Sequence, residues 1–108
     1  MTTFDRREDA FESKFAHDAE LQFRAHARRN KLLGLWAAAL LGKTGSEADD
    51  YAKAVVASDL EHAGHEDVFR KIRADFDAAG VSQSDHQIRR TMDELMAKAI
   101  EQVRTEKV

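Results

Sequence analysis

The sequence predicts an all-α protein, and three features of the chain support this fold class. The 108 residues include no Pro and only five Gly, so few positions interrupt a helix. Good helix formers such as Ala, Leu, Glu, Lys and Arg are abundant. Apolar residues recur at intervals of three and four along several segments, which is the spacing of amphipathic helices. A chain of this length is expected to form one domain with one modest core.

The first long helix is expected to end at the turn formed by residues 42–45, Gly-Lys-Thr-Gly. Its core-facing stripe is predicted to consist of Leu21, Ala25, Leu32, Leu35, Trp36 and Ala39, with Leu33 and Leu40 outside it. Trp36 either packs in the core or lines a ligand pocket, and core packing is favoured. Gly34 and the nearby alanines are small enough for a neighbouring helix to approach closely.

Three further helices are marked by caps and glycines. Ser46 with Asp49 and Ser84 with Gln87 have the spacing of capping boxes, which predicts the starts of the second and fourth helices. Gly64 is expected to end the second helix, Gly64 or His65 to start the third, and Gly80 to end it. The predicted core residues are Tyr51, Ala52, Val55 and Val56 in the second helix, with Leu60 as a further candidate, Val68, Phe69, Ile72 and Phe76 in the third, and Ile88, Met92, Leu95, Met96, Ala99 and Val103 in the fourth. The short connections predict a compact four-helix bundle.

The N-terminal segment differs from the rest because Phe4, Phe11 and Phe15 stand out in a highly charged stretch. On a helix these rings share one face, since steps of seven and four residues return to the same side. This face is predicted to lie roughly a quarter-turn from the core-facing stripe of the first long helix. Residues 1–18 are therefore predicted to form an amphipathic arm that binds a partner's groove, and residues 19–108 to form the four-helix bundle.

Composition excludes several classes of function. A formal charge of −3 with 34% charged residues is unlike the basic excess of a nucleic-acid binder. The absence of Cys excludes disulfides and thiolate metal sites. The longest apolar run, residues 32–41, is too short to span a bilayer, and the N-terminus lacks the pattern of a secretory signal. We expect a cytoplasmic protein without direct membrane insertion.

Three local patterns invite a chemical interpretation. Residues 42–44, Gly-Lys-Thr, resemble part of a phosphate-binding loop, but the upstream Gly and the preceding strand are missing, so a helix-ending turn is favoured. His62 and His65, beside acidic residues, suggest a metal site, but a solvated interhelix turn is favoured. Paired catalytic carboxylates and a catalytic triad are both missing, so an enzyme is not expected.

One basic cluster stands out in the first long helix, consisting of Arg24, Arg28, Arg29 and Lys31. These side chains are suited to bind phosphates or the acidic residues of a protein partner. Alternatively, they form a solvated face that pairs with acids on a neighbouring helix, and this interpretation is favoured over nucleic-acid binding.

Over almost its whole length the chain resembles the zeta subunit of alphaproteobacterial F-type ATP synthases. The strings that carry the resemblance are Phe-Asp-Arg-Arg-Glu-Asp-Ala-Phe-Glu at 4–12, Lys-Phe-Ala-His-Asp at 14–18, Ala-Arg-Arg-Asn-Lys-Leu-Leu-Gly-Leu-Trp-Ala-Ala at 27–38, Leu-Gly-Lys-Thr-Gly at 41–45 and Ala-Gly-His-Glu-Asp-Val at 63–68. The third string is long enough to be specific.

The resemblance implies a four-helix bundle whose N-terminal arm enters the head of the synthase between a catalytic and a noncatalytic subunit and blocks ATP hydrolysis. The protein would then lie peripherally on the membrane-bound synthase. The implied contact residues are Thr3, Phe4, Asp5, Arg6, Arg7, Glu8, Phe11, Glu12, Lys14 and Phe15, with possible secondary contacts from Arg24, Arg28, Arg29 and Lys31.

Two alternatives stay open. The bundle could sense a nucleotide through Arg28, Arg29, Lys31 or Lys43, and the resemblance makes weak adenine-nucleotide binding reasonable to test. The absence of a Gly-rich loop at a helix start argues against it. The other alternative is a generic adaptor or nucleic-acid-associated bundle. Neither alternative requires a metal or another cofactor.

Overall fold

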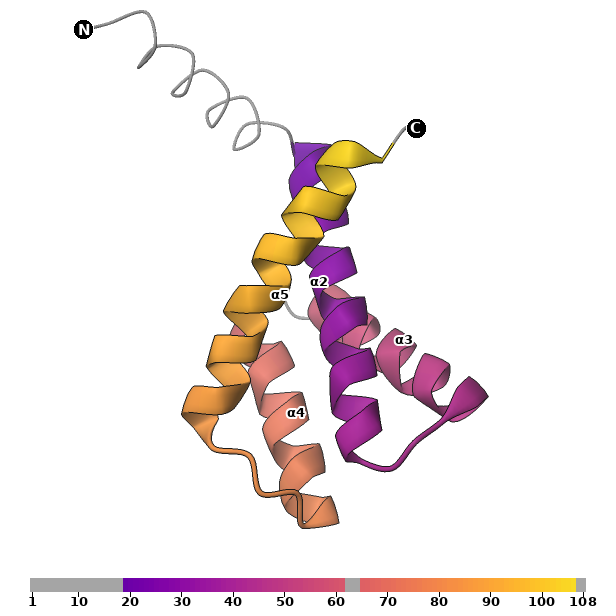
Figure 1. Ribbon diagram of the computed structural model, residues 1–108, viewed down its shortest axis with the longest axis vertical. Helices are drawn as coiled ribbons and strands as arrows, with labels where there is room; N and C mark the ends of the chain where they lie inside the picture. Colours follow the sequence, from indigo (N-terminus) through magenta and orange to yellow (C-terminus); the bar gives the residue numbers. More distant parts are fainter. Residues whose placement is uncertain (1–18, 62–64, 107–108) are drawn as a thin grey trace, which may run out of the picture.

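The computed structural model describes residues 19–61 and 65–106, and these form four α-helices without a strand (Figure 1). The helices are α2 (Ala19–Leu40), α3 (Gly45–Glu61), α4 (His65–Ala79) and α5 (Asp85–Thr105). The predicted all-α four-helix bundle is therefore confirmed. The predicted arm, residues 1–18, lies outside the described residues, as do residues 62–64 and 107–108.

Two helices end in the hydrogen-bond pattern that favours a left-handed glycine. After α2, the Lys43 N–H donates to the Ala38 carbonyl at 2.9 Å, and Gly42 adopts φ +77°. After α4, the Val81 N–H donates to the Phe76 carbonyl at 2.9 Å, and Gly80 adopts φ +71°. These are Schellman motifs. The predicted stop at Gly80 and the interpretation of residues 42–44 as a helix-ending turn are confirmed.

The two predicted capping boxes have different outcomes. At α5 the box is complete, because Ser84 Oγ accepts from the Gln87 N–H at 3.1 Å and Gln87 Oε1 accepts from the Ser84 N–H at 2.8 Å. At α3 the prediction is wrong, since the helix begins at Gly45 and Ser46 lies inside its first turn. The Thr44 carbonyl accepts the Glu47 N–H at 3.2 Å there, so the backbone already continues the helix across Ser46.

The helix α2 forms the centre of the molecule and packs against both α3 and α5. The shorter α4 lies against α3 and α5. The molecule is elongated, with extents of 53 × 30 × 23 Å, because the N-terminal part of α2 and the C-terminal part of α5 run together beyond the other two helices (Figure 1). We call this two-helix extension the stalk, and it consists of residues 19–28 and 99–106.

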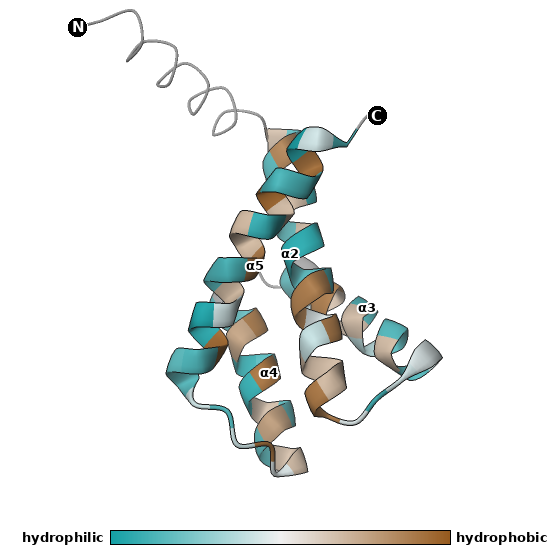
Figure 2. Cartoon of the chain, in the orientation of Figure 1, coloured by the Kyte–Doolittle hydropathy of each residue, from teal (hydrophilic) through white to brown (hydrophobic). Residues whose placement is uncertain are grey.

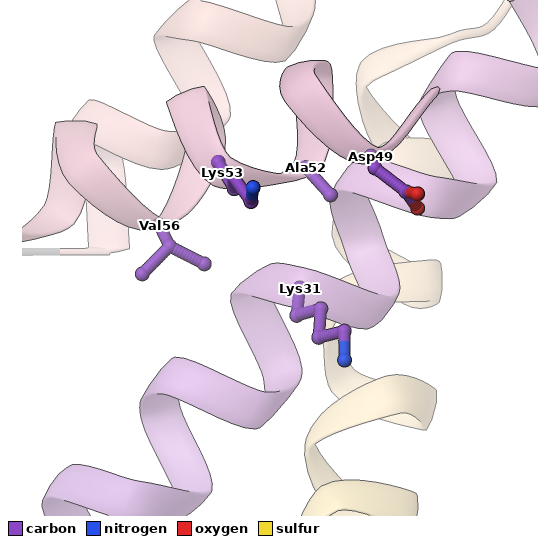
Figure 3. A pocket seen from close by; sticks show the side chains of 5 residues that line it. All are labelled: Lys31, Asp49, Ala52, Lys53 and Val56. Atoms are coloured by element: carbon purple, nitrogen blue, oxygen red, sulfur yellow. The ribbon is translucent and has the colours of Figure 1, made fainter. Parts of the chain in front are cut away.

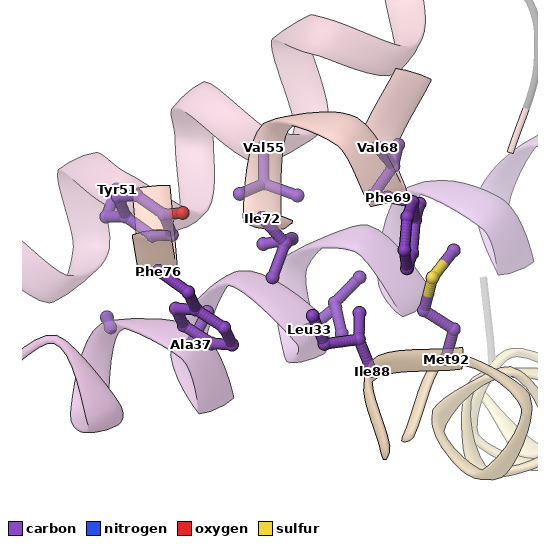
Figure 4. Close-up of a cluster of buried hydrophobic side chains, with 11 residues drawn as sticks. Leu33, Ala37, Tyr51, Val55, Val68, Phe69, Ile72, Phe76, Ile88 and Met92 are labelled. Atoms are coloured by element: carbon purple, nitrogen blue, oxygen red, sulfur yellow. The ribbon is translucent and has the colours of Figure 1, made fainter. Parts of the chain in front are cut away.

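The core lies at the other end of α2, where all four helices meet (Figure 4). Its largest fully buried side chains are Phe76, Leu33, Ile72, Ile88, Val55 and Val68, with Asn30 as the one polar member. Trp36 packs against this cluster and meets the Phe76 ring edge-on, with 5.7 Å between ring centroids. The predicted core packing of Trp36 is confirmed.

The contact between α2 and α3 depends on Gly34. A Cβ atom at this position would lie 2.6 Å from the Ala52 Cα, which is far inside van der Waals contact. Because the obstructing atom belongs to the backbone, it cannot rotate away. The predicted close approach of a helix at Gly34 is confirmed, and Ala52 is the residue that it contacts.

The predicted core-facing stripe of α2 is correct only in part, since Ala25 is buried and Trp36 packs against the core, but the inner face includes other residues. The buried positions of this helix are Ala25, Arg29, Asn30, Leu33, Gly34, Ala37 and Ala38, whereas Ala39 is exposed and Leu32, Leu35 and Trp36 are only partly buried. Leu33, which was placed outside the stripe, is fully buried. Apolar side chains occur on every side of α2, so the large ones misled the assignment of its inner face.

This correction removes one argument for a separate N-terminal arm. Leu33 lies about five helical turns after Phe15, so on an ideal helix Phe15 shares the face that Leu33 buries. The predicted quarter-turn offset therefore no longer supports the arm, while the Phe residues themselves lie outside the described residues. The arm prediction now depends on the resemblance and on the charged, Phe-rich composition of residues 1–18.

The other helices follow the predicted patterns. Figure 2 shows hydrophobic and hydrophilic bands alternating along α4 and α5, as amphipathic helices require. All predicted core residues of α4 are buried, and in α5 the fully or largely buried ones are Ile88, Met92, Ala99 and Val103. Leu95 and Met96 are partly buried. In α3, Tyr51, Ala52 and Val55 are buried and Val56 is partly buried, while the side chain of Leu60 is outside the described set.

Candidate partner-binding surface

The sequence predicts two groups of partner-binding residues, and the structure describes one of them. The arm residues Thr3, Phe4, Asp5, Arg6, Arg7, Glu8, Phe11, Glu12, Lys14 and Phe15 lie outside the described residues. The possible secondary contacts Arg24, Arg28, Arg29 and Lys31 all lie in α2, and the first two are in its stalk part. These four cations are separated by the fold into three different environments.

Arg24 and Arg28 pair with the end of α5. The Arg24 Nη2 lies 3.0 Å from a carboxylate oxygen of Glu106, and the Arg28 Nη2 donates to the other oxygen. Arg28 also donates to the Gln102 side-chain carbonyl at 2.8 Å. The hydrogen bond from Arg28 is the main cause that holds the pKa of Glu106 below its usual value. This arrangement matches the favoured interpretation of the basic cluster, in which it pairs with acids on a neighbouring helix.

Arg29 points inward and is only 3% exposed. Its Nε donates to the Asn30 Oδ1 at 2.7 Å, and the charges of Asp59 and Asp93 favour its protonated form. Burial is the larger effect and lowers the pKa of the guanidinium. A side chain buried in this way does not present its charge at the surface, so the structure gives no support to a partner contact at Arg29, which stays a prediction.

Lys31 is exposed and lies at the edge of a groove between α2 and α3. The groove holds about 490 Å³, and Asp49, Ala52, Lys53 and Val56 line its α3 side (Figure 3). Figure 3 shows Val56 and Lys31 on opposite sides of this open space. Of the four predicted cations, Lys31 is therefore the one that is exposed in a concave surface.

The groove continues along the stalk. A second hollow of about 320 Å³ shares Lys31 and Val56 with the first and extends to the end of α5. The residues that line it are Phe23, Arg24, Ala27, Arg28, Lys31, Val56, Val103 and Glu106. We call the two hollows together the α2 groove.

Phe23 is the residue in this surface that the sequence analysis missed. Its side chain is 59% exposed, which is the highest value among the large hydrophobic residues that the structure describes. A signal was present in the sequence, because Phe23 belongs to neither predicted stripe. An aromatic residue without a place on a core-facing stripe is a candidate for partner binding.

The metal site suggested by the histidines and the possibility of a membrane span can be checked within the described residues. Within residues 19–61 and 65–106, no three His, Asp or Glu side chains gather in a group suited to a metal ion. His62 and the side chain of His65 are outside the described set. None of the four helices is both long enough and apolar enough to cross a membrane.

The family model of ATPase inhibitor subunit zeta matches residues 1–102 of the chain. This match spans all four helices and the Phe-rich N-terminal segment. The chain belongs to the zeta family. The resemblance stated from the sequence is therefore confirmed at the level of the family.

A solved structure is similar to the chain in sequence and in fold. It is a solution NMR structure that is 48% identical to this zeta-family chain, with a TM-score of 0.70. The similarity covers 81% of this chain and 99% of the other. No curated protein matches the chain.

Proposed function

We propose that this protein is the inhibitory subunit of an F-type ATP synthase, and that residues 1–18 insert between a catalytic and a noncatalytic subunit of the synthase head. The observation that carries the proposal is the match to the ATPase inhibitor zeta family, which begins at residue 1 and so includes the Phe-rich segment. In this proposal the bundle carries the arm, and the arm blocks ATP hydrolysis.

The position of α2 supports this division of roles. Residues 1–18 connect directly to Ala19, the first residue of α2. That end of α2 lies in the stalk, beyond α3 and α4 (Figure 1). A partner that approaches this end meets only two helices of the bundle, so the bulk of the protein stays clear of the site where the arm inserts.

The energetics of the arm set a condition on binding. Burial of Phe4, Phe11 and Phe15 contributes about 1.5 to 3 kcal/mol each before ordering costs. Ordering the backbone costs on the order of 1 to 2 kcal/mol per residue, so additional contacts are needed. Charged neighbours of these rings, such as Arg6 and Glu8, set the register through ion pairs. Inhibition requires that the arm bind one rotary state more tightly than the next.

The proposal is tested by ATP hydrolysis with the detached head of a cognate synthase. Full-length protein is expected to inhibit hydrolysis, and a version that lacks residues 1–15 is expected to leave it unchanged. If both versions inhibit equally, the arm is not the inhibitory element. If neither inhibits, the family membership does not carry the activity to this chain.

Point substitutions separate the arm from the core. Phe11→Ala or Phe15→Ala is expected to weaken inhibition with a nearly unchanged melting temperature. Trp36→Ala is expected to lower the melting temperature, because Trp36 packs against Phe76. An equal loss of stability at all three positions would place the Phe residues in the core.

The alternative of nucleotide sensing gains no support from the geometry. Lys43 lies over the Tyr51 ring at 5.9 Å, beyond the C-terminal end of α2, whereas Arg28 pairs with Glu106 near the other end. Arg29 is buried. The proposed nucleotide-binding cations therefore do not converge on one site. Adenine-nucleotide binding itself is not tested by this geometry and stays a prediction.

A further inference from the structure

The α2 groove has the shape and chemistry of a surface that receives a helix. It is lined by residues of α2, of α3 and of the end of α5. Its apolar lining consists of small or short side chains, namely Ala27, Ala52, Val56 and Val103. Small residues on paired helices leave room for the ridge of a third helix. The exposed ring of Phe23 lies at the stalk end and provides an aromatic anchor.

The charge of the groove is opposite to that of the whole chain. Four cations line it, Arg24, Arg28, Lys31 and Lys53, against two carboxylates, Asp49 and Glu106. The chain as a whole carries a formal charge of −3. The lining therefore favours a ligand with negative charge, which the rest of the surface repels.

Two of these cations are available to a partner. Arg24 and Arg28 already share Glu106. Lys31 and Lys53 are exposed, and within the described part of the chain neither forms an ion pair. They come from facing helices and flank the apolar lining, so one acidic ligand in the groove can meet both.

We propose that the α2 groove is a second docking surface for the synthase head, and that its occupant is an acidic amphipathic helix of that head. The apolar face of this helix packs on Phe23, Ala27 and Val56, and its carboxylates pair with Lys31 and Lys53. A protein helix fits better than nucleic acid because the groove combines its cations with apolar side chains and the chain is acidic overall. This inference rests on the proposed function, since it adds a contact to the same complex.

The groove contributes affinity and the arm contributes inhibition, and this division gives a distinct signature. A weakened groove raises the concentration of protein needed for half-maximal inhibition, but the inhibition reached at saturation stays the same. Loss of the arm lowers the inhibition at saturation. Titration of ATP hydrolysis by the detached head, together with the dissociation constant from calorimetry, measures both quantities for the full-length chain.

The test uses charge reversal in the groove and a matched control outside it. Lys31→Glu with Lys53→Glu is expected to raise the dissociation constant about tenfold at low salt, and by less at high salt. Phe23→Ala is expected to raise it about tenfold at either salt concentration. The control, Lys98→Glu with Arg70→Glu, reverses two exposed cations of α5 and α4 and is expected to leave it unchanged. Lys31→Gln with Lys53→Gln, which neutralises instead of reversing the charges, replaces the Glu variant if that variant does not fold.

Each outcome decides the inference. If the unsubstituted protein binds and inhibits but the groove variants match it, the second docking surface is wrong and the proposed function stands. If the groove and control variants weaken binding equally, the change in the protein's overall charge causes the loss of affinity, and the groove is not a binding site. Tighter binding by the groove variants, or a changed oligomeric state by ultracentrifugation, would assign the groove to this chain's own N-terminal segment or to a second copy. If the unsubstituted protein does not bind the head at all, both proposals fail.

Discussion

The two ends of α2 differ in what surrounds them. At the C-terminal end, α2 meets all three other helices, and Leu33 and Ala37 are fully buried next to Phe76 and Ile72. In the stalk, α2 has α5 as its main neighbour, and polar pairs such as Arg28 with Glu106 join the two helices. Packing therefore defines the fold at one end, and the other end keeps polar and aromatic side chains accessible for recognition.

Side chains at the two ends of α2 should contribute differently to the free energy of unfolding. Buried apolar side chains contribute about 1.5 to 3 kcal/mol each, whereas partly exposed ion pairs contribute about 0 to 1 kcal/mol. Changes in the core end should therefore affect the free energy of unfolding far more than changes in the stalk. The stalk should tolerate substitutions that alter binding, which is the property that a docking surface needs.

The largest effect is expected from Phe76→Ala in the core. Phe76 is fully buried, and its loss removes the edge-on contact with Trp36 and leaves a cavity. We expect a loss of about 3 to 5 kcal/mol in the free energy of unfolding, measured by urea denaturation. Phe23→Ala is the matched control in the stalk, and we expect a loss below about 1 kcal/mol. Similar losses at the two positions would show that the stalk is packed as tightly as the core.

The second effect tests the close approach of α2 and α3. Gly34→Val places a side chain where the Ala52 Cα leaves no room, so the two helices must separate. We expect a loss of about 2 to 3 kcal/mol in the free energy of unfolding. Ala39→Val makes a comparable change at an exposed position of the same helix and should cost little. If the two variants are equally stable, the helices separate more easily than close packing implies.

The third effect lies where the stalk joins the core. Arg29→Met removes the donor to the Asn30 Oδ1 and the positive charge near Asp59 and Asp93. We expect a loss of about 1 to 3 kcal/mol in the free energy of unfolding, because polar groups stay buried without their partner. Within the described part of the chain the Asn30 Nδ2 already lacks a hydrogen-bond partner. Arg29→Met with Asn30→Leu should therefore be more stable than Arg29→Met alone, and a still less stable double variant would contradict this account.

The sequence predicted the helices with one strong apolar face better than the helix with several. In α4 and α5 the apolar residues lie on one side, so their spacing identified Phe76, Ile88 and Met92 as core residues. In α2, large apolar side chains surround the helix, and its inner face includes alanines and the polar pair Arg29 and Asn30. An analysis of apolar spacing follows the large apolar residues. It therefore misses a buried helix face that consists of small residues, which let a neighbouring helix approach closely.

The candidate surface was harder to predict because its residues are far apart in the chain. Arg24 and Glu106 are separated by 82 residues, and only the antiparallel packing of α2 and α5 brings them together. The groove likewise joins Val56 to Val103. The sequence identified the basic cluster, but burial of Arg29 and exposure of Lys31 follow from the rotation of α2 about its axis, which the apolar stripe had assigned wrongly.

The smallest effect, and the one specific to the stalk, is a dependence on pH at Glu106. Its pKa is held below the usual value chiefly by the hydrogen bond from Arg28, so the charged carboxylate stabilises the folded state at neutral pH. This contribution is fully present above the usual carboxyl pKa of about 4.3 and is lost as the pH falls through the lower folded value. Glu106→Gln should therefore be slightly less stable than the unsubstituted protein at pH 7, and the two should converge in acid. Urea denaturation in steps from pH 7 to strong acid measures the difference, and 1 M salt should reduce it at pH 7. A difference that stays constant with pH would mean that Glu106 acts through packing and not through its charge.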